Sequence, residues 1–268
     1  MKTNQYILRL LALAVINPIF LMTLPGFSAP GYAWSLLMAF LTALIQAVVL
    51  AETIRHQNGQ TKWSVTWKIF ALFYGVTFFQ SGIEAVLFLH YMQDTMSLTQ
   101  LNEMILHGLL TTLLVVPVAV LLFYTKRTPE AAAQLPSRTI LIRISVLSLA
   151  YVVVYIFFGG FVFKPLAGAY FDTYYGNLQL PDWLFPFQVV RGMIWALLAW
   201  GLMTLLPPSR TLRIYLTILF IALPISSLLL PVNEIMPAPI RMAHLIEVTS
   251  SMVFYGWLCG WYLSRVPR

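Results

Sequence analysis

The sequence predicts an all-α fold, a polytopic transmembrane helical bundle of about eight spans, on three observations. Hydrophobic residues make up 60% of the 268 residues and charged residues only 9%, a balance that soluble domains of this length do not have. The apolar residues form repeated runs of about 20, the length of helix that crosses a ~30 Å hydrocarbon core. The runs are continuously apolar, whereas strands of a transmembrane barrel alternate apolar and polar residues over about 10 positions. We therefore expect residues 1–268 to form a single helical membrane domain.

Charged and turn residues mark the ends of the apolar runs. Along the chain, the first run follows Lys2, the third begins at Trp67, the sixth begins at Leu184, and the eighth follows Pro237. Each run is long enough to cross the bilayer as a helix. The eight predicted spans lie near residues 6–26, 32–52, 67–92, 103–124, 140–163, 184–206, 212–231 and 238–263.

The connections between these spans alternate in charge. Basic residues are concentrated in connections 53–66, 125–139 and 207–211, whereas the intervening connections are nearly free of Lys and Arg. Cytoplasmic connections of membrane proteins carry an excess of these residues, so the alternation predicts that the N-terminus and the C-terminus are both cytoplasmic. Thirteen of the 16 basic residues then lie at the cytoplasmic edge: Lys2, Arg9, Arg55, Lys62, Lys68, Lys126, Arg127, Arg138, Arg143, Arg210, Arg213, Arg265 and Arg268.

The first predicted span also has features of a secretory signal. Lys2 and Arg9 precede an apolar core, and small residues follow at Gly26, Ser28 and Ala29. The apolar stretch is longer than a usual signal core, and its removal would leave seven spans with an external N-terminus. We therefore expect an uncleaved span in a bacterial inner (plasma) membrane, because the connections are short and no organelle address is visible.

Net charge and cysteine content exclude two other classes of protein. The formal charge is +7, but the basic residues are scattered between apolar runs and form no stripe, so nucleic-acid binding is not predicted. Cys259 is the only cysteine, which excludes an internal disulfide. The expected partner is the lipid bilayer, together with a small polar or anionic solute.

Ionisable residues inside the predicted spans gather at one depth. At a lipid-facing position near the helix centre each such residue costs about 2.5–3.5 kcal/mol, so each needs a partner or a function. A rise of ~1.5 Å per residue along each helical span gives the depth of each residue. Seven residues fall in the outer half, where they predict a polar chamber if their faces turn inward together: Glu84, His90, His107, Arg191, Arg241, His244 and Glu247.

Spacing within two of the spans predicts shared helix faces. Gln188 and Arg191 are three residues apart, and Arg241, His244 and Glu247 follow one another at the same interval. Arg offers a fixed fork for carboxylate or phosphate, and a carboxylate partly removed from water is suited to proton exchange. The candidates for solute binding or proton coupling are Glu84, Gln188, Arg191, Arg241 and Glu247. Alternatively, the two acids and the arginines form ion pairs that only brace the bundle.

Histidines among these residues also allow a metal site. His90, His107, His244 and Glu247 could offer nitrogen and oxygen ligands to zinc or iron, and His244 and Glu247 have the spacing that places two ligands on one helix face. The motif is weak, because the chain has no His-Glu-x-x-His pair, no cysteine cluster and no short-spaced histidine boxes.

Prolines and glycines suggest local features of the helices. Pro18, Pro117 and Pro224 lie near the middle of their predicted spans, where they either kink the helix or interrupt it as in transporters. Gly159 and Gly160 predict a close approach of two helices. The aromatic connection 164–183 is interpreted either as an interfacial cap on the bundle or as a lid over a site.

The sequence is compatible with three functions. The first is binding or proton-linked transport of a small polar or anionic solute through the outer-half site. The second is an intramembrane metal-dependent hydrolase or lipid-modifying enzyme, with the histidines as ligands or base. The third is a non-catalytic membrane subunit or assembly factor, in which the polar residues only brace the bundle.

Overall fold

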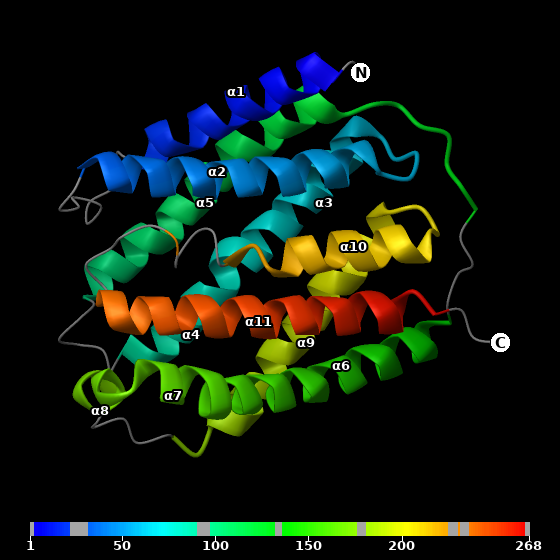
Figure 1. Ribbon diagram of the computed structural model, residues 1–268. Coiled ribbons are helices and arrows are strands. Elements are labelled where there is room, and N and C mark those ends of the chain that lie inside the picture. The colour runs from blue at the N-terminus through cyan, green and yellow to red at the C-terminus, as the bar shows by residue number, and fades with distance from the viewer. Residues whose placement is uncertain are drawn as a thin grey trace. The chain divides into compact units, whose positions relative to one another are not determined.

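A computed structural model shows α-helices joined by short connections (Figure 1). It describes residues 3–21, 32–89, 97–131, 136–175, 181–224, 230 and 236–265. Over these residues there is no β-strand, so the predicted all-α fold is confirmed. Within these described ranges, five segments are long and apolar enough to cross a membrane: Leu36–Arg55, Lys62–Val86, Leu98–Phe123, Ser137–Ala167 and Leu184–Leu205.

These five segments coincide with the second to the sixth predicted spans, although several begin earlier than predicted. Two of the early starts have a local cause in helix capping. Thr61 accepts a hydrogen bond from the Ser64 backbone N–H at 3.2 Å, and Ser97 forms a capping box with Gln100. Such caps satisfy the free N–H groups of a first helical turn, so the helix begins before the apolar run does. The other three predicted spans remain predictions as membrane crossings.

Contacts divide the chain into two units. Unit 1 comprises Met1–Thr128 and Leu223–Ala238, and unit 2 comprises Pro129–Ala222 and Pro239–Arg268. The helices of unit 1 are α1 (Thr3–Leu21), α2 (Tyr32–Arg55), α3 (Lys62–Tyr74), the single π-helical turn (π-turn) η1 (Gly75–Phe79), α4 (Gln80–Phe88) and α5 (Leu98–Phe123). The helices of unit 2 are α6 (Ser137–Phe158), the π-turn η3 (Gly159–Phe163), α7 (Lys164–Ala167), α8 (Ala169–Tyr175), α9 (Leu184–Leu205), α10 (Arg210–Ile221) and α11 (Ala238–Leu263).

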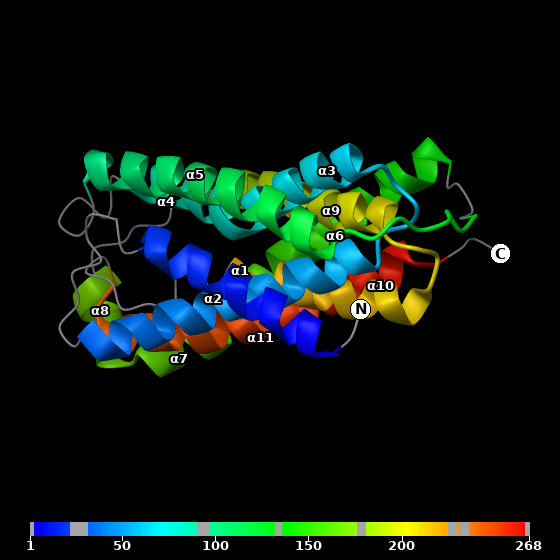
Figure 2. The ribbon, with the colours of Figure 1, turned by 90° about the horizontal axis from the view of Figure 1, so that it is seen from above.

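In unit 1, α1 packs on α2, and α5 packs against α1, α2 and α3. Figure 2 shows α5 running beside α3 and α4. The side chains of Leu50, Phe73, Val116 and Phe123 are buried in this core. On α5, Gly108 lies against Phe78 of η1, and a Cβ added to the glycine would be 2.5 Å from Phe78 Cγ. This glycine therefore permits close contact between α5 and the π-turn.

In unit 2, small residues again allow helices to approach closely. A Cβ added to Gly192 of α9 would lie 2.5 Å from the carbonyl oxygen of Ser148 on α6. On α11, Gly256 and Gly260 face α10, and a Cβ added to Gly260 would lie 2.7 Å from Ile214 Cα. The two glycines are four residues apart, the small-xxx-small spacing that brings membrane helices into backbone contact.

The predictions for the three prolines and for the glycine pair have different outcomes. Pro117 lies inside α5, and α1 continues past Pro18. Pro224 is not inside a helix of full span length, because α10 ends at Ile221. The prediction for Gly159 and Gly160 is wrong over the described residues: a Cβ added to either would meet nothing within 4 Å. Both glycines instead open the π-turn η3.

Candidate functional site

The predicted site residues are distributed over both units. Glu84 on α4 and His107 on α5 belong to unit 1, and His90 lies outside the described residues. Unit 2 contains Gln188 and Arg191 on α9 and, on α11, Arg241, His244 and Glu247. The single outer-half chamber joining all of these residues therefore stays a prediction.

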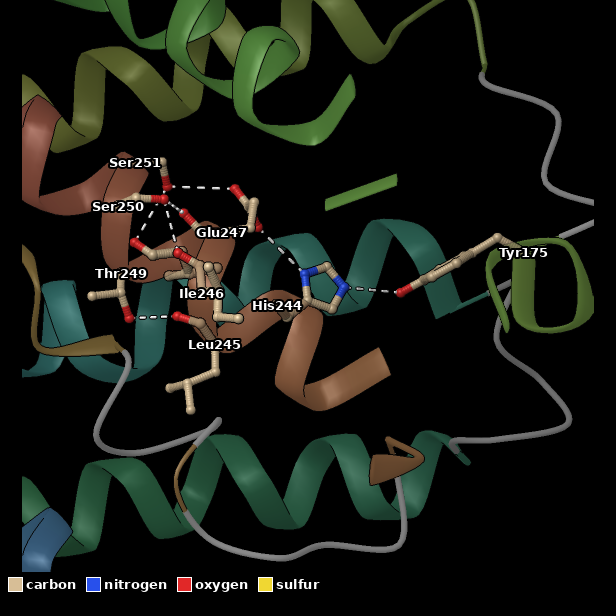
Figure 3. Close-up of polar contacts among 9 residues, drawn as sticks. Tyr175, His244, Leu245, Ile246, Glu247, Thr249, Ser250 and Ser251 are labelled. Atoms are coloured by element: carbon tan, nitrogen blue, oxygen red, sulfur yellow. Dashed lines mark hydrogen bonds and ion pairs between the residues drawn. The ribbon is translucent and has the colours of Figure 1, made fainter. Parts of the chain in front are cut away.

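Four polar side chains of unit 2 form a continuous chain of contacts (Figure 3). The hydroxyl of Tyr175 lies 3.2 Å from His244 Nε2, and His244 Nδ1 lies 3.4 Å from a carboxylate oxygen of Glu247. The other carboxylate oxygen of Glu247 accepts a hydrogen bond from the Ser251 hydroxyl at 3.4 Å. We call Tyr175, His244, Glu247 and Ser251 the relay.

Spacing along α11 explains three members of the relay. His244, Glu247 and Ser251 are separated by three and four residues, so they share one face of the helix. On this shared face, His244 and Glu247 are in contact. Ser251 could have been added from the same periodicity, whereas no local signal identifies Tyr175, which is 69 residues away from His244 in the sequence.

Two irregularities in the backbone accompany the contacts made to His244. The π-turn η3 ends at Phe163, whose ring stacks on the imidazole with centroids 3.9 Å apart and planes at 16°. Gly168 then adopts a positive φ of 53° between α7 and α8, a conformation that L side chains rarely adopt. The chain turns there into α8, which carries Tyr175. Single π-turns within α-helices occur frequently at functional sites.

The relay has the donor and acceptor types needed to pass a proton. When His244 is neutral, the Nδ1–H tautomer donates to Glu247, and Nε2 accepts from Tyr175. The side chain of His244 is only 22% exposed and that of Glu247 only 12%. A histidine and a carboxylate in contact have the donor and acceptor atoms needed to exchange a proton.

Gln188 and Arg191 meet on α9, as their spacing predicts. Arg191 donates from Nη1 to the side-chain oxygen of Gln188 at 3.1 Å, and both residues are buried. The guanidinium lies 5.8 Å from the ring centroids of Tyr151 and Phe187. The guanidinium is thus held by an amide and two aromatic faces on α6 and α9, an arrangement in which a cation is stabilised by the ring quadrupoles.

Three predicted site residues lie outside these two groups of contacts: His107, Glu84 and Arg241. His107 Nδ1 lies 3.5 Å from the hydroxyl of Thr111, one turn further along α5. Glu84 is partly buried and Arg241 is buried. Glu247 contacts His244 and Ser251, and whether the acids and arginines form bracing ion pairs stays a prediction.

The possible metal ligands do not assemble into a larger group over the part of the chain that the structure describes. No set of three or more His, Cys, Asp or Glu side chains lies close enough there to hold a metal ion. His244 and Glu247 meet as a pair, while His107 belongs to the other unit. Cys259 is buried and free.

A second polar cluster, which the sequence did not indicate, surrounds Glu52 of α2. Its carboxylate accepts hydrogen bonds from the Tyr6 hydroxyl at 2.5 Å and from Arg55 at 3.2 Å, and His56 lies 3.5 Å away. The Arg55 guanidinium also stacks over the Tyr6 ring at 4.6 Å. These contacts join α1 to the end of α2, so we interpret the cluster as one that holds the two helices together.

The chain matches no known protein-family model, no curated protein and no solved structure.

Proposed function

We propose that the protein binds a small polar or anionic solute within the membrane and couples the movement of that solute to protons. The relay is the observation that carries this proposal. Chains of carboxylate and histidine side chains inside membrane segments are typical of proton pathways in pumps and transporters. In the relay the imidazole of His244 contacts a tyrosine hydroxyl on one side and a carboxylate on the other.

Solute recognition is proposed for the arginine side chains. Arg191 is held with its guanidinium beside Gln188, and Arg241 precedes His244 by one turn of α11. A guanidinium presents a planar set of donors that matches carboxylate or phosphate. Binding of an anion near Arg241 would favour a protonated His244, because opposite charges stabilise each other at short range. Solute binding and proton uptake would then be coupled.

The proposed topology has eight spans, with both termini in the cytoplasm of a bacterial cell and the chain in its inner membrane. Arginine contacts at three helix ends support this orientation. Arg9 donates to the carbonyl of Leu122 at the end of α5, Arg213 to that of Leu206 after α9, and Arg143 to those of Leu263 and Arg265 at the end of α11. All three ends are predicted to be cytoplasmic, where the positive-inside rule places basic residues.

The test uses purified protein in liposomes that contain the pH-sensitive dye pyranine. Addition of succinate, glutamate or inorganic phosphate outside should acidify the lumen faster than in protein-free liposomes for at least one of the three anions. Glu247→Gln keeps the shape of the side chain and removes the exchangeable carboxylate, so acidification should fall to the protein-free rate. Asp182→Asn makes the same change at an exposed position outside the relay and should retain the wild-type rate.

Two results would contradict this proposal. Wild-type protein that moves no protons with any of the three anions would exclude this kind of coupling. Equal rates in wild type and Glu247→Gln would remove the relay from the mechanism. Size-exclusion chromatography of each variant separates loss of coupling from loss of folding.

A second function is favoured by one specific observation. The contacts of Tyr175 with His244 and of His244 with Glu247 follow the pattern of covalent catalysis, in which a nucleophile contacts a base and an acid orients that base. An intramembrane hydrolase or lipid-modifying enzyme with Tyr175 as the reacting group would show hydrolysis of p-nitrophenyl butyrate that is lost in Tyr175→Phe. Zinc or iron that copurifies with wild type and is lost in folded His244→Ala would indicate the metal-dependent form of this enzyme.

A further inference from the structure

Unit 1 carries an open groove between α3 and α5 that is separate from the relay. Its volume is about 490 Å³, within the ~300–1,000 Å³ range of small-molecule sites. Its lining includes Lys62, Trp63 and Trp67 on α3 and Leu113, Pro117 and Leu121 on α5. Apart from Lys62 and Thr66, the side chains that line the groove are aromatic or aliphatic.

The cationic group stands at one end of the groove. Lys62 is the first residue of α3, and Leu121 lies close to the end of α5. Trp67 is five residues into α3 and Leu113 is eight residues before Leu121, so the lining extends about 12 Å along the helices at 1.5 Å per residue. Both helices belong to the segments long and apolar enough to cross a membrane. The groove thus runs from a helix end, beside Lys62, toward the interior of a membrane span.

Exposed tryptophans mark the same end. Trp63 is 69% exposed and Trp67 is 49% exposed, and their rings meet edge to face with centroids 5.3 Å apart. Large apolar rings with a polar N–H favour the headgroup layer of a bilayer. The tryptophans therefore place the Lys62 end of the groove at the membrane interface and the Leu113 end in the hydrocarbon.

We propose that this groove binds an anionic phospholipid. The groove complements a lipid along its length. The Lys62 cation lies at the level of the headgroup, and aliphatic side chains lie at the level of the acyl chains. The lipid phosphate pairs with the Lys62 ammonium, and an acyl chain lies against Leu113, Pro117 and Leu121. One basic side chain near an anionic lipid contributes about 1 kcal/mol, which corresponds to a preference of about fivefold over a zwitterionic lipid.

The test measures quenching of tryptophan fluorescence by brominated lipids in reconstituted vesicles. The signal of Trp63 and Trp67 is obtained as the difference between wild type and the Trp63→Phe/Trp67→Phe double variant. Brominated phosphatidylglycerol should quench this signal with a relative binding constant about fivefold above that of brominated phosphatidylcholine. Lys62→Gln should reduce the ratio to about one.

Two further variants make the result specific. Arg138→Gln removes a basic charge from an exposed position in unit 2 and should leave the ratio unchanged. Leu113→Phe fills the deep end of the groove and retains Lys62, so quenching by brominated phosphatidylglycerol should fall even if Lys62→Gln cannot be purified. Equal quenching by the two lipids in wild type, or an undiminished preference in folded Lys62→Gln, would overturn the proposal and leave only ordinary boundary lipid.

Discussion

At the scale of single residues, side-chain volume decides the packing of unit 2. Gly192 lies where α9 meets α6, and the hydroxyl of the buried Tyr255 reaches the Gly192 carbonyl at 3.5 Å and the Leu147 carbonyl at 3.2 Å. Ser148 donates to the Val189 carbonyl at 2.5 Å across the same contact. These bonds need close backbone approach, which a residue larger than glycine would prevent. The contact between α6 and α9 thus depends on the residue at position 192 being glycine.

Gly192→Ala tests this dependence. The added Cβ would lie 2.5 Å from Ser148 O, against backbone that cannot move aside as a side-chain tip can. We expect destabilisation of about 1–3 kcal/mol, as for other overpacked contacts, seen as an apparent melting temperature in detergent that is several degrees lower. Gly160→Ala is the matched control, because a Cβ there meets nothing within 4 Å. Equal melting temperatures for both variants would show that the close approach does not limit stability.

At the scale of secondary-structure elements, the two π-turns change which face each helix presents. One extra residue in a helical turn rotates everything beyond it by about 100° around the axis, since an α-helix has 3.6 residues per turn. In unit 1, η1 brings Phe78 onto Gly108 of α5. In unit 2, η3 ends at Phe163, which stacks on His244. The π-turns therefore contribute to packing in one unit and to the candidate site in the other.

Phe163→Leu tests the contribution of η3. The substitution keeps an apolar side chain at the end of the π-turn and removes the ring that stacks on His244. The proton movement measured with pyranine should then fall toward the level of Glu247→Gln, because the imidazole loses the contact that helps to fix its orientation, while the helical circular dichroism signal stays unchanged. Gly160→Ala leaves Phe163 unchanged and should retain the wild-type rate. Undiminished proton movement in Phe163→Leu would show that the stack on His244 has no role in coupling.

At the scale of the whole molecule, the direction of each helix through the membrane depends on the distribution of basic residues. Over the residues that the structure describes, five of the eight predicted spans coincide with helices that are long and apolar enough to cross a membrane. The basic connections and both termini fall on one side of the membrane only if the number of spans is even. A single helical domain and cytoplasmic termini remain predictions that follow from this pattern.

Cysteine labelling tests the orientation. In a Cys259→Ala background, Lys126→Cys and Asp182→Cys each introduce one thiol at an exposed position. We expect a membrane-impermeant maleimide to label the Asp182→Cys variant in intact cells and the Lys126→Cys variant only after lysis, because connection 125–139 is predicted to be cytoplasmic and 164–183 external. Labelling of both thiols in intact cells, or the reverse pattern, would contradict the proposed topology.

The sequence by itself determined the all-α fold and the local pairs on one helix face, and it predicted eight apolar spans, five of which coincide with long apolar helices among the described residues. These features depend on composition and on residue spacing along a single helix, both of which are visible in one dimension. Arg191 with Gln188 and His244 with Glu247 were predictable for this reason. The small-xxx-small spacing of Gly256 and Gly260 was equally visible, although only the structure shows that it faces α10.

Only the tertiary structure decided which distant segments meet. Tyr175 reaches His244 because the π-turn and the positive φ of Gly168 redirect the chain into α8, and neither irregularity leaves a periodic signal in the sequence. Glu52 is the centre of a cluster because α1 packs beside α2. The groove beside Lys62 exists because α3 and α5 pack with a space between their exposed faces. Such contacts depend on the three-dimensional path of the chain, which spacing along one helix does not specify.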